Sequence, residues 1–190
     1  NNEAGYQGGG VYAEGMHTVT FSMNDCEITN NTSTSTVDNN YGGVVIGNIF
    51  HLKNVLIAGN DGPVYLSPYA PSTLENVTIT NNGAGVHVGD GLNPAYNPGI
   101  NINNTIIAQN GDDPYQQFIS VPQSGVNNEV DIFIEYSLIN GLWWANGESN
   151  ILFSFGSYPG EPLSKLEDPL FTNPDEGDYT LGWGSPCINT

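Results

Sequence analysis

The chain has 190 residues, of which 38% are hydrophobic and 12% charged, and it contains 26 Asn and 24 Gly. That length and apolar content suffice for one domain with a narrow core, and the many turn-forming residues argue against long helices. Twenty acidic residues stand against Lys53 and Lys165, giving a formal net charge of -18. Nucleic acids and anionic membranes need a basic footprint, so we expect neither as a partner, and no apolar run reaches membrane-spanning length.

A seven-residue phrase recurs along the chain. It begins as Asp25-Cys26-Glu27-Ile28-Thr29-Asn30-Asn31 and starts again at Asn54, Asn76, Asn104 and, in degenerate form, Tyr136. Its second and fourth residues are apolar or small, which is the alternation of a strand with one buried face. The uneven spacing of 29, 22, 28 and 32 residues indicates a solenoid whose insertions lie in loops.

Two further strands are expected before each phrase. One set covers residues 19–21, 50–52, 73–75, 100–102 and 130–134, and an earlier Gly- or Pro-led set covers 10–13, 43–46, 63–66 and 85–88. About three strands per coil predict an all-β fold, a right-handed parallel β-helix with equivalent positions stacked ~4.8 Å apart. We assign residues 1–142 to the coils and 143–190 to an irregular C-terminal cap of the same domain.

The Asn that ends each phrase predicts a ladder. Asn31, Asn60, Asn82 and Asn110 should stack at one bend, with their amides bonded between coils and their backbone in the left-handed region. Cys26 and Cys187 should be ~20 Å apart, because at least four coils separate them, so we expect two unpaired cysteines.

Two patterns resemble known proteins. The Asn-x-x-Ile-x-x-Asn phrase on Gly-rich coils is similar to the right-handed β-helices of the pectate-lyase-like superfamily. The ending Asp168-Pro169-Leu170-Phe171, followed by 173–181 and 184–189, resembles the choice-of-anchor Q segment of bacterial surface proteins. This resemblance implies an exported bacterial protein, extracellular or at the cell surface, and a chain that is part of something longer. It does not fix an activity, since the solenoid carries lyases, hydrolases and adhesins.

Enzymatic residues are sparse on the predicted coils. Lys53 and Glu75 fall on adjacent coils, where they could serve a polysaccharide lyase or simply form a surface ion pair. Glu75 and Glu135 stand two coils apart, roughly 10 Å, just beyond the usual separation of an inverting glycosidase pair.

Ligand-binding candidates lie on the outward columns. Tyr12, Val45, Tyr65 and His87 share one column, in which Tyr12, Tyr65 and His87 could offer rings to a sugar or protein, or merely stack to stabilise the sheet. A second column is more apolar and needs a cover. It contains Glu27, Leu56, Thr78, Ile106 and Leu138. The aromatic segment from Trp143 through Phe153, Phe155 and Tyr158 is expected to fold back either across this column or across the open end of the solenoid.

No cofactor is required by these patterns, although loop carboxylates could bind Ca²⁺. The candidates are Asp112, Asp113, Asp175 and Asp178, and the alternative is an acidic surface that keeps the protein soluble. The leading hypothesis is a non-catalytic extracellular module, structural or adhesive, whose partner is a cell-surface polysaccharide or protein. It would dock to another subunit at its poorly covered N-terminal coil. A carbohydrate-active enzyme, lyase or glycoside hydrolase, is the alternative.

Overall fold

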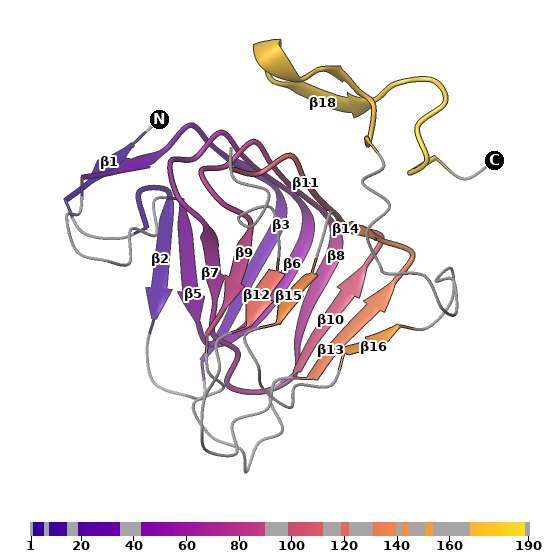
Figure 1. Ribbon diagram of the computed structural model, residues 1–190. Coiled ribbons are helices and arrows are strands. Elements are labelled where there is room, and N and C mark those ends of the chain that lie inside the picture. The colour runs from indigo at the N-terminus through magenta and orange to yellow at the C-terminus, as the bar shows by residue number, and fades with distance from the viewer. Residues whose placement is uncertain are drawn as a thin grey trace.

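The computed structural model describes residues 2–5, 8–14, 19–34, 43–89, 99–111, 119–121, 131–139, 142–144, 151–153 and 168–188. Apart from one short 3-10 turn, the regular elements of this part of the chain are all strands, and most of them stack in parallel, which confirms the all-β prediction and has the arrangement of a parallel β-solenoid (Figure 1). Among the described residues, no helix is long and apolar enough to cross a membrane.

One sheet has six parallel strands and contains the predicted Gly-led set. Its order is β15-β12-β9-β7-β5-β2. The strands are β2 (Val11–Glu14), β5 (Val44–Gly47), β7 (Val64–Leu66), β9 (Val86–Val88), β12 (Ile119–Val121) and β15 (Leu142–Trp144). Each strand pairs with the next coil's equivalent residue, for example Val11 with Val44 and Val44 with Val64.

The other large sheet combines the upstream strands with the phrases. Its long members β3 (Thr20–Thr29), β6 (Ile49–Ala58) and β8 (Ser72–Thr80) each run through both segments. Farther along, the two segments are separate strands: β10 (Gly99–Asn103) with β11 (Ile106–Ala108), then β13 (Asp131–Glu135) with β14 (Leu138–Ile139). Finally, β16 (Ile151–Phe153) pairs in parallel with β13.

Left-handed residues turn the chain on both sides of each phrase. The first residue of every phrase has a positive φ: Asp25 (53°), Asn54 (54°), Asn76 (54°), Asn104 (48°) and Tyr136 (49°). The sixth residue does so in four phrases: Asn30 (55°), Gly59 (66°), Asn81 (51°) and Gln109 (54°). The expectation that the seventh-position Asn residues are left-handed was therefore wrong: the residue before each of them takes that conformation and makes the bend, while the seventh-position side chains are bonded between coils.

The seventh-position Asn residues form the predicted ladder. The side-chain Nδ2 of Asn31, Asn60 and Asn82 donates to Oδ1 of the next Asn at 3.0, 2.9 and 3.0 Å, ending at Asn110. The same Oδ1 atoms accept the backbone N–H of Asn31, Asn60 and Asn82. Asn2 adds a rung, since its Nδ2 lies 3.0 Å from Asn31 Oδ1. All but Asn2 are buried, so the ladder satisfies polar groups that water does not reach.

The core is a continuous column of aliphatic side chains between the two large sheets. Its largest fully buried members are Phe50, Ile46, Leu52, Ile57, Leu66, Leu74, Ile79, Ile100, Ile102, Ile107 and Ile132. Neither Cys26 nor Cys187 forms a disulfide, as expected, and Cys26 packs, only partly buried, against this core.

Beyond the predicted coil boundary at residue 142, parallel stacking continues through β15 and β16. The chain then forms an antiparallel hairpin of β17 (Phe171–Asn173) and β18 (Asp178–Leu181), joined by the 3-10 turn η2 (Pro174–Glu176). Gly177 closes this turn with a φ of 82°, which favours glycine. At the other end, β1 (Glu3–Ala4) pairs in parallel with β4 (Thr32–Ser33).

Candidate ligand-binding groove

The more apolar outward column lies in register across successive coils. Glu27 pairs with Leu56, Leu56 with Thr78, Thr78 with Ile106 and Ile106 with Leu138. Since paired residues of a parallel sheet point to the same side, the first three side chains form a strip over β3, β6 and β8. The strip grades from a carboxylate through an aliphatic side chain to a hydroxyl.

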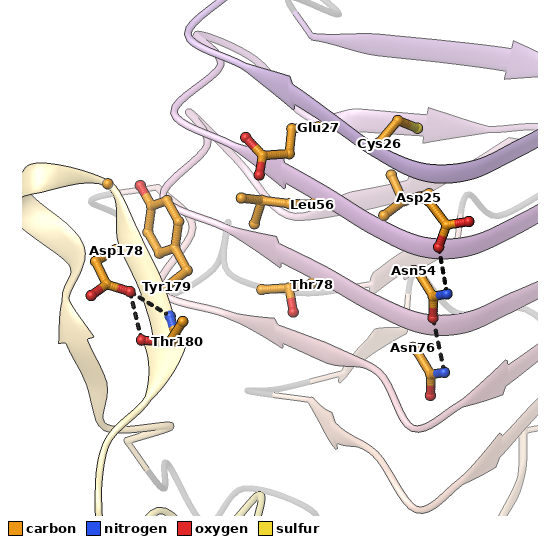
Figure 2. Close-up of a pocket in the computed structure, with 12 residues that line it drawn as sticks. Asp25, Cys26, Glu27, Asn54, Leu56, Asn76, Thr78, Asp178, Tyr179 and Thr180 are labelled. Carbon is orange, nitrogen blue, oxygen red and sulfur yellow. Dashed lines mark hydrogen bonds between the residues drawn. The ribbon is translucent and has the colours of Figure 1, made fainter.

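This strip is the floor of a groove of about 470 Å³ between the solenoid and the C-terminal hairpin. In Figure 2, Glu27, Leu56 and Thr78 lie in the middle, with Tyr179 of β18 on one side and Asp25, Asn54 and Asn76 on the other. The floor spans two coil-to-coil steps, roughly 10 Å along the solenoid. The groove thus joins residues separated by more than 150 positions in the sequence.

A second side-chain ladder forms the rim opposite the hairpin. Asn54 Nδ2 donates to Asp25 Oδ1 at 2.7 Å, and Asn76 Nδ2 donates to Asn54 Oδ1 at 3.1 Å. These are the left-handed first residues of the phrases, so their side chains leave the strand at a bend and remain exposed. The rim is therefore an ordered row of amides with a carboxylate at its end.

Tyr179 connects the hairpin to the solenoid. Its Oη accepts a hydrogen bond from Asn81 Nδ2 at 3.3 Å, and its ring meets the Phe171 ring edge to face with centroids 5.5 Å apart. A second hydrogen bond links the C-terminal segment to the solenoid: Gln109 Nε2 donates to Asp168 Oδ1 at 3.0 Å. Asn81 and Gln109 are left-handed sixth residues of their phrases, so both hydrogen bonds lie along the same bend of the solenoid.

Asp178 is held in its ionised form within the hairpin. Its Oδ1 accepts from Thr180 Oγ1 at 2.6 Å and from the Thr180 backbone N–H at 3.0 Å. These two hydrogen bonds lower the pKa of Asp178 below its ordinary value, and the side-chain hydrogen bond has the larger effect. A fixed negative charge therefore lies at the hairpin side of the groove.

The cover of the apolar column differs from the expectation. Leu142–Trp144 and Ile151–Phe153 form strands β15 and β16 of the two large sheets, while Phe155 and Tyr158 fall outside the described residues. The hairpin around Tyr179 stands over the column instead. The tyrosine of the C-terminal ending was the sequence signal that could have indicated this cover.

Cys26 also lines the groove. The pKa of its thiol is raised mainly by burial and, to a smaller extent, by the neighbouring Asp25 carboxylate. The thiolate is thus disfavoured at neutral pH, which makes Cys26 a poor nucleophile.

The three aromatic ligand candidates lie on the six-stranded sheet, away from this groove. Tyr65 and His87 are stacked on adjacent coils with centroids 5.5 Å apart and an interplanar angle of 21°. Tyr12 is 50% exposed and donates its hydroxyl to Glu14 Oε2 at 2.5 Å. Between them Val45, expected to face outward, is fully buried, so the column is not a continuous open surface.

Lys53 and Glu75 pair on adjacent coils as expected, with Nζ and Oε1 2.7 Å apart. Their side chains are 49% and 46% exposed, so the ion pair is solvated and contributes about 0–1 kcal/mol to stability. Glu135 continues the column through Asn103.

Of the calcium candidates, Asp112 and Asp113 lie outside the described residues. Asp175 belongs to η2 and Asp178 to β18, where Thr180 occupies Oδ1 of Asp178. Across the described part of the chain, no group of three or more His, Cys, Asp or Glu side chains is placed to hold a metal ion.

Comparison with known proteins gives no relative: no family model, no curated protein and no solved structure matches this chain. Its function must therefore be argued from its own residues.

Proposed function

We propose that the chain is a right-handed parallel β-helix with about three strands per coil that serves outside the cell. In this proposal it is a non-catalytic structural or adhesive module of a bacterial surface, and it assembles through its N-terminal coil. The resemblance of its ending to choice-of-anchor segments supports the location, and the state of the first coil supports the assembly.

The exposed N-terminal core carries the proposal. Phe21, Met23 and Cys26 are only partly buried, whereas their partners on the next coil, Phe50, Leu52 and Val55, are at most 2% exposed. Val19, just before β3, is 54% exposed. The first coil thus keeps the apolar residues of an interior coil instead of replacing them with polar ones. A coil with apolar residues exposed in this way is stabilised when another coil packs against it.

The partner proposed is another copy of the chain, and salt should control the contact. Glu3, Glu14, Asp25 and Glu27 all lie on the first coil or beside it and are partly or fully exposed. Copies of a chain with a net charge of -18 repel one another at low ionic strength. Docking should therefore strengthen once salt screens these charges, while the apolar contact persists.

The test is concentration-dependent assembly of the full chain, measured by analytical ultracentrifugation at low and high NaCl. We expect association at high salt that Met23→Asp abolishes, because a carboxylate would be buried against apolar side chains. Phe133→Asp is the control, since Phe133 is 37% exposed on the outer face of β13. A monomer at every concentration, or equal loss in both variants, would contradict the proposal.

A direct assay addresses the non-catalytic part. The protein is incubated with neutral and uronate-containing polysaccharides, with and without Ca²⁺, and reducing ends and unsaturated products are measured. We expect no turnover. Turnover that disappears in Lys53→Ala or Glu75→Ala would assign an enzymatic role to the ion pair and overturn this part of the proposal.

A further inference from the structure

The groove beside the hairpin combines features that suit one class of ligand. Its floor places Leu56 between Glu27 and Thr78, and the Tyr179 ring lies on the hairpin side (Figure 2). Apolar contact, aromatic surface, hydroxyl and carboxylate groups therefore alternate over a short distance. Binding sites generally join a mainly apolar surface with a few fixed polar groups that set orientation.

The polar groups of the groove are already ordered. Asn54 and Asn76 are held in the rim ladder, Thr180 fixes Asp178, and Asn81 fixes the Tyr179 hydroxyl. A ligand would therefore meet side chains that are already restricted to one conformation, which lowers the entropic cost of association. Amide and carboxylate oxygens can accept from hydroxyl groups, and the Thr78 hydroxyl can both donate and accept.

Charge narrows the ligand class. Among the residues that the structure describes, Asp25, Glu27 and Asp178 line the groove, and no Lys or Arg does. Uronates, sulfated sugars and phosphates would be repelled. A metal ion is not favoured, because no three of these carboxylates converge on one point. A basic side chain would be attracted by the carboxylates, but its charged group would make no use of Leu56.

We infer that the groove binds a neutral saccharide chain. The sugar rings lie along the floor from Glu27 to Thr78, with their C–H faces against Leu56 and Tyr179. Their hydroxyl groups donate to the Glu27 carboxylate and to the side-chain oxygens of the rim. The adhesive part of the proposed function would then act through this groove, although the saccharide site does not depend on the docking of the N-terminal coil.

The experiment titrates the full chain with neutral hexasaccharides of glucose, mannose and xylose, and follows the amide chemical shifts by NMR. Saturable shifts should appear at Leu56, Thr78 and Tyr179 with at least one neutral hexasaccharide. Tyr179→Ala and Leu56→Ala should each weaken this binding by about tenfold, corresponding to about 1.4 kcal/mol. Leu56→Ala acts from the solenoid side, so it remains informative if Tyr179→Ala releases the hairpin.

Trp183→Ala is the matched control, since Trp183 is a fully exposed ring of the same C-terminal region outside the groove. It should bind as the unaltered chain does. The inference is overturned if no neutral hexasaccharide binds, if Leu56→Ala binds normally, or if only hexalysine or hexagalacturonate shifts these resonances. The monomeric Met23→Asp variant should retain binding, so a failure here is distinguishable from a failure of assembly.

Discussion

At the scale of single residues, the two Asn ladders differ in whether water can replace a hydrogen bond that is lost. Asn60 is 2% exposed; its Nδ2 bonds to Asn82 and to the Ile28 carbonyl, and its Oδ1 accepts from Asn31. Asn54 makes comparable side-chain bonds on an exposed rim. A lost hydrogen bond costs most where the former partner stays buried.

We therefore expect Asn60→Ala to lower the free energy of unfolding by about 3 kcal/mol, because it leaves several buried polar groups without a hydrogen-bond partner. The control is Asn54→Gly, which keeps the left-handed backbone and should cost less than about 1 kcal/mol. Urea denaturation measures both. Similar losses in the two variants would show that burial does not set the strength of the ladder.

Thr80 offers the opposite case. It is fully buried, and its Oγ1 has no hydrogen-bond partner within the described part of the chain. Thr80→Val removes the unsatisfied hydroxyl at nearly constant shape, so the free energy of unfolding should rise by about 1 kcal/mol. Ser72→Ala should instead lower it, because Ser72 Oγ accepts from the Phe50 N–H and donates to the Ala70 carbonyl. Chemical denaturation of the pair gives the comparison, and destabilisation by Thr80→Val would refute the assignment.

At the scale of elements, each strand was predictable where the alternation of its residues was strong. The Gly-led strands and the upstream strands appear where the sequence places them, because burial of every second residue leaves little choice of face. The bends were assigned less well, since Asn occurs at both the sixth and the seventh position of a phrase and only the backbone reveals that the sixth residue is the left-handed one. The hairpin was not predicted, because antiparallel pairing of 171–173 with 178–181 leaves no long periodic pattern.

The hairpin should respond to acid through Asp178. The hydrogen bonds from Thr180 lower the pKa of Asp178 in the folded chain. The contribution of its carboxylate to folding stability is therefore complete above the ordinary pKa of about 3.9, and it is lost as the pH falls through the lowered pKa. A carboxyl NMR titration should show a midpoint below about 3.9. Thr180→Val removes the side-chain donor and should raise that midpoint. An unchanged midpoint in the variant would contradict the assigned cause.

At the scale of the whole molecule, charge imbalance is the dominant property. Twenty acidic residues face two basic ones, so self-repulsion opposes the compact state. Raising NaCl from about 0.01 M to about 0.15 M shortens the screening length from about 30 Å to about 8 Å. We expect the melting temperature to rise by a few degrees, measured by calorimetry. A fall in melting temperature would mean that attractive surface pairs outweigh the repulsion.

CaCl₂ at equal ionic strength tests the calcium hypothesis in the same experiment. Direct binding by Asp112, Asp113, Asp175 or Asp178 would raise the melting temperature above the NaCl value, because a ligand that binds only the folded state stabilises it. Equal melting temperatures would indicate screening alone and would count against a calcium site.

The sequence by itself determined the inward and outward faces of the strands, the Asn ladder and the pairing of Lys53 with Glu75. The strand faces and the ladder repeat from coil to coil, and the ion pair follows from the same fixed stacking of equivalent positions. Tertiary structure alone decided what covers the apolar column and where the groove lies. The groove is lined by both Leu56 on β6 and Tyr179 on β18, and no repeating pattern records how a non-repeating segment returns to the solenoid.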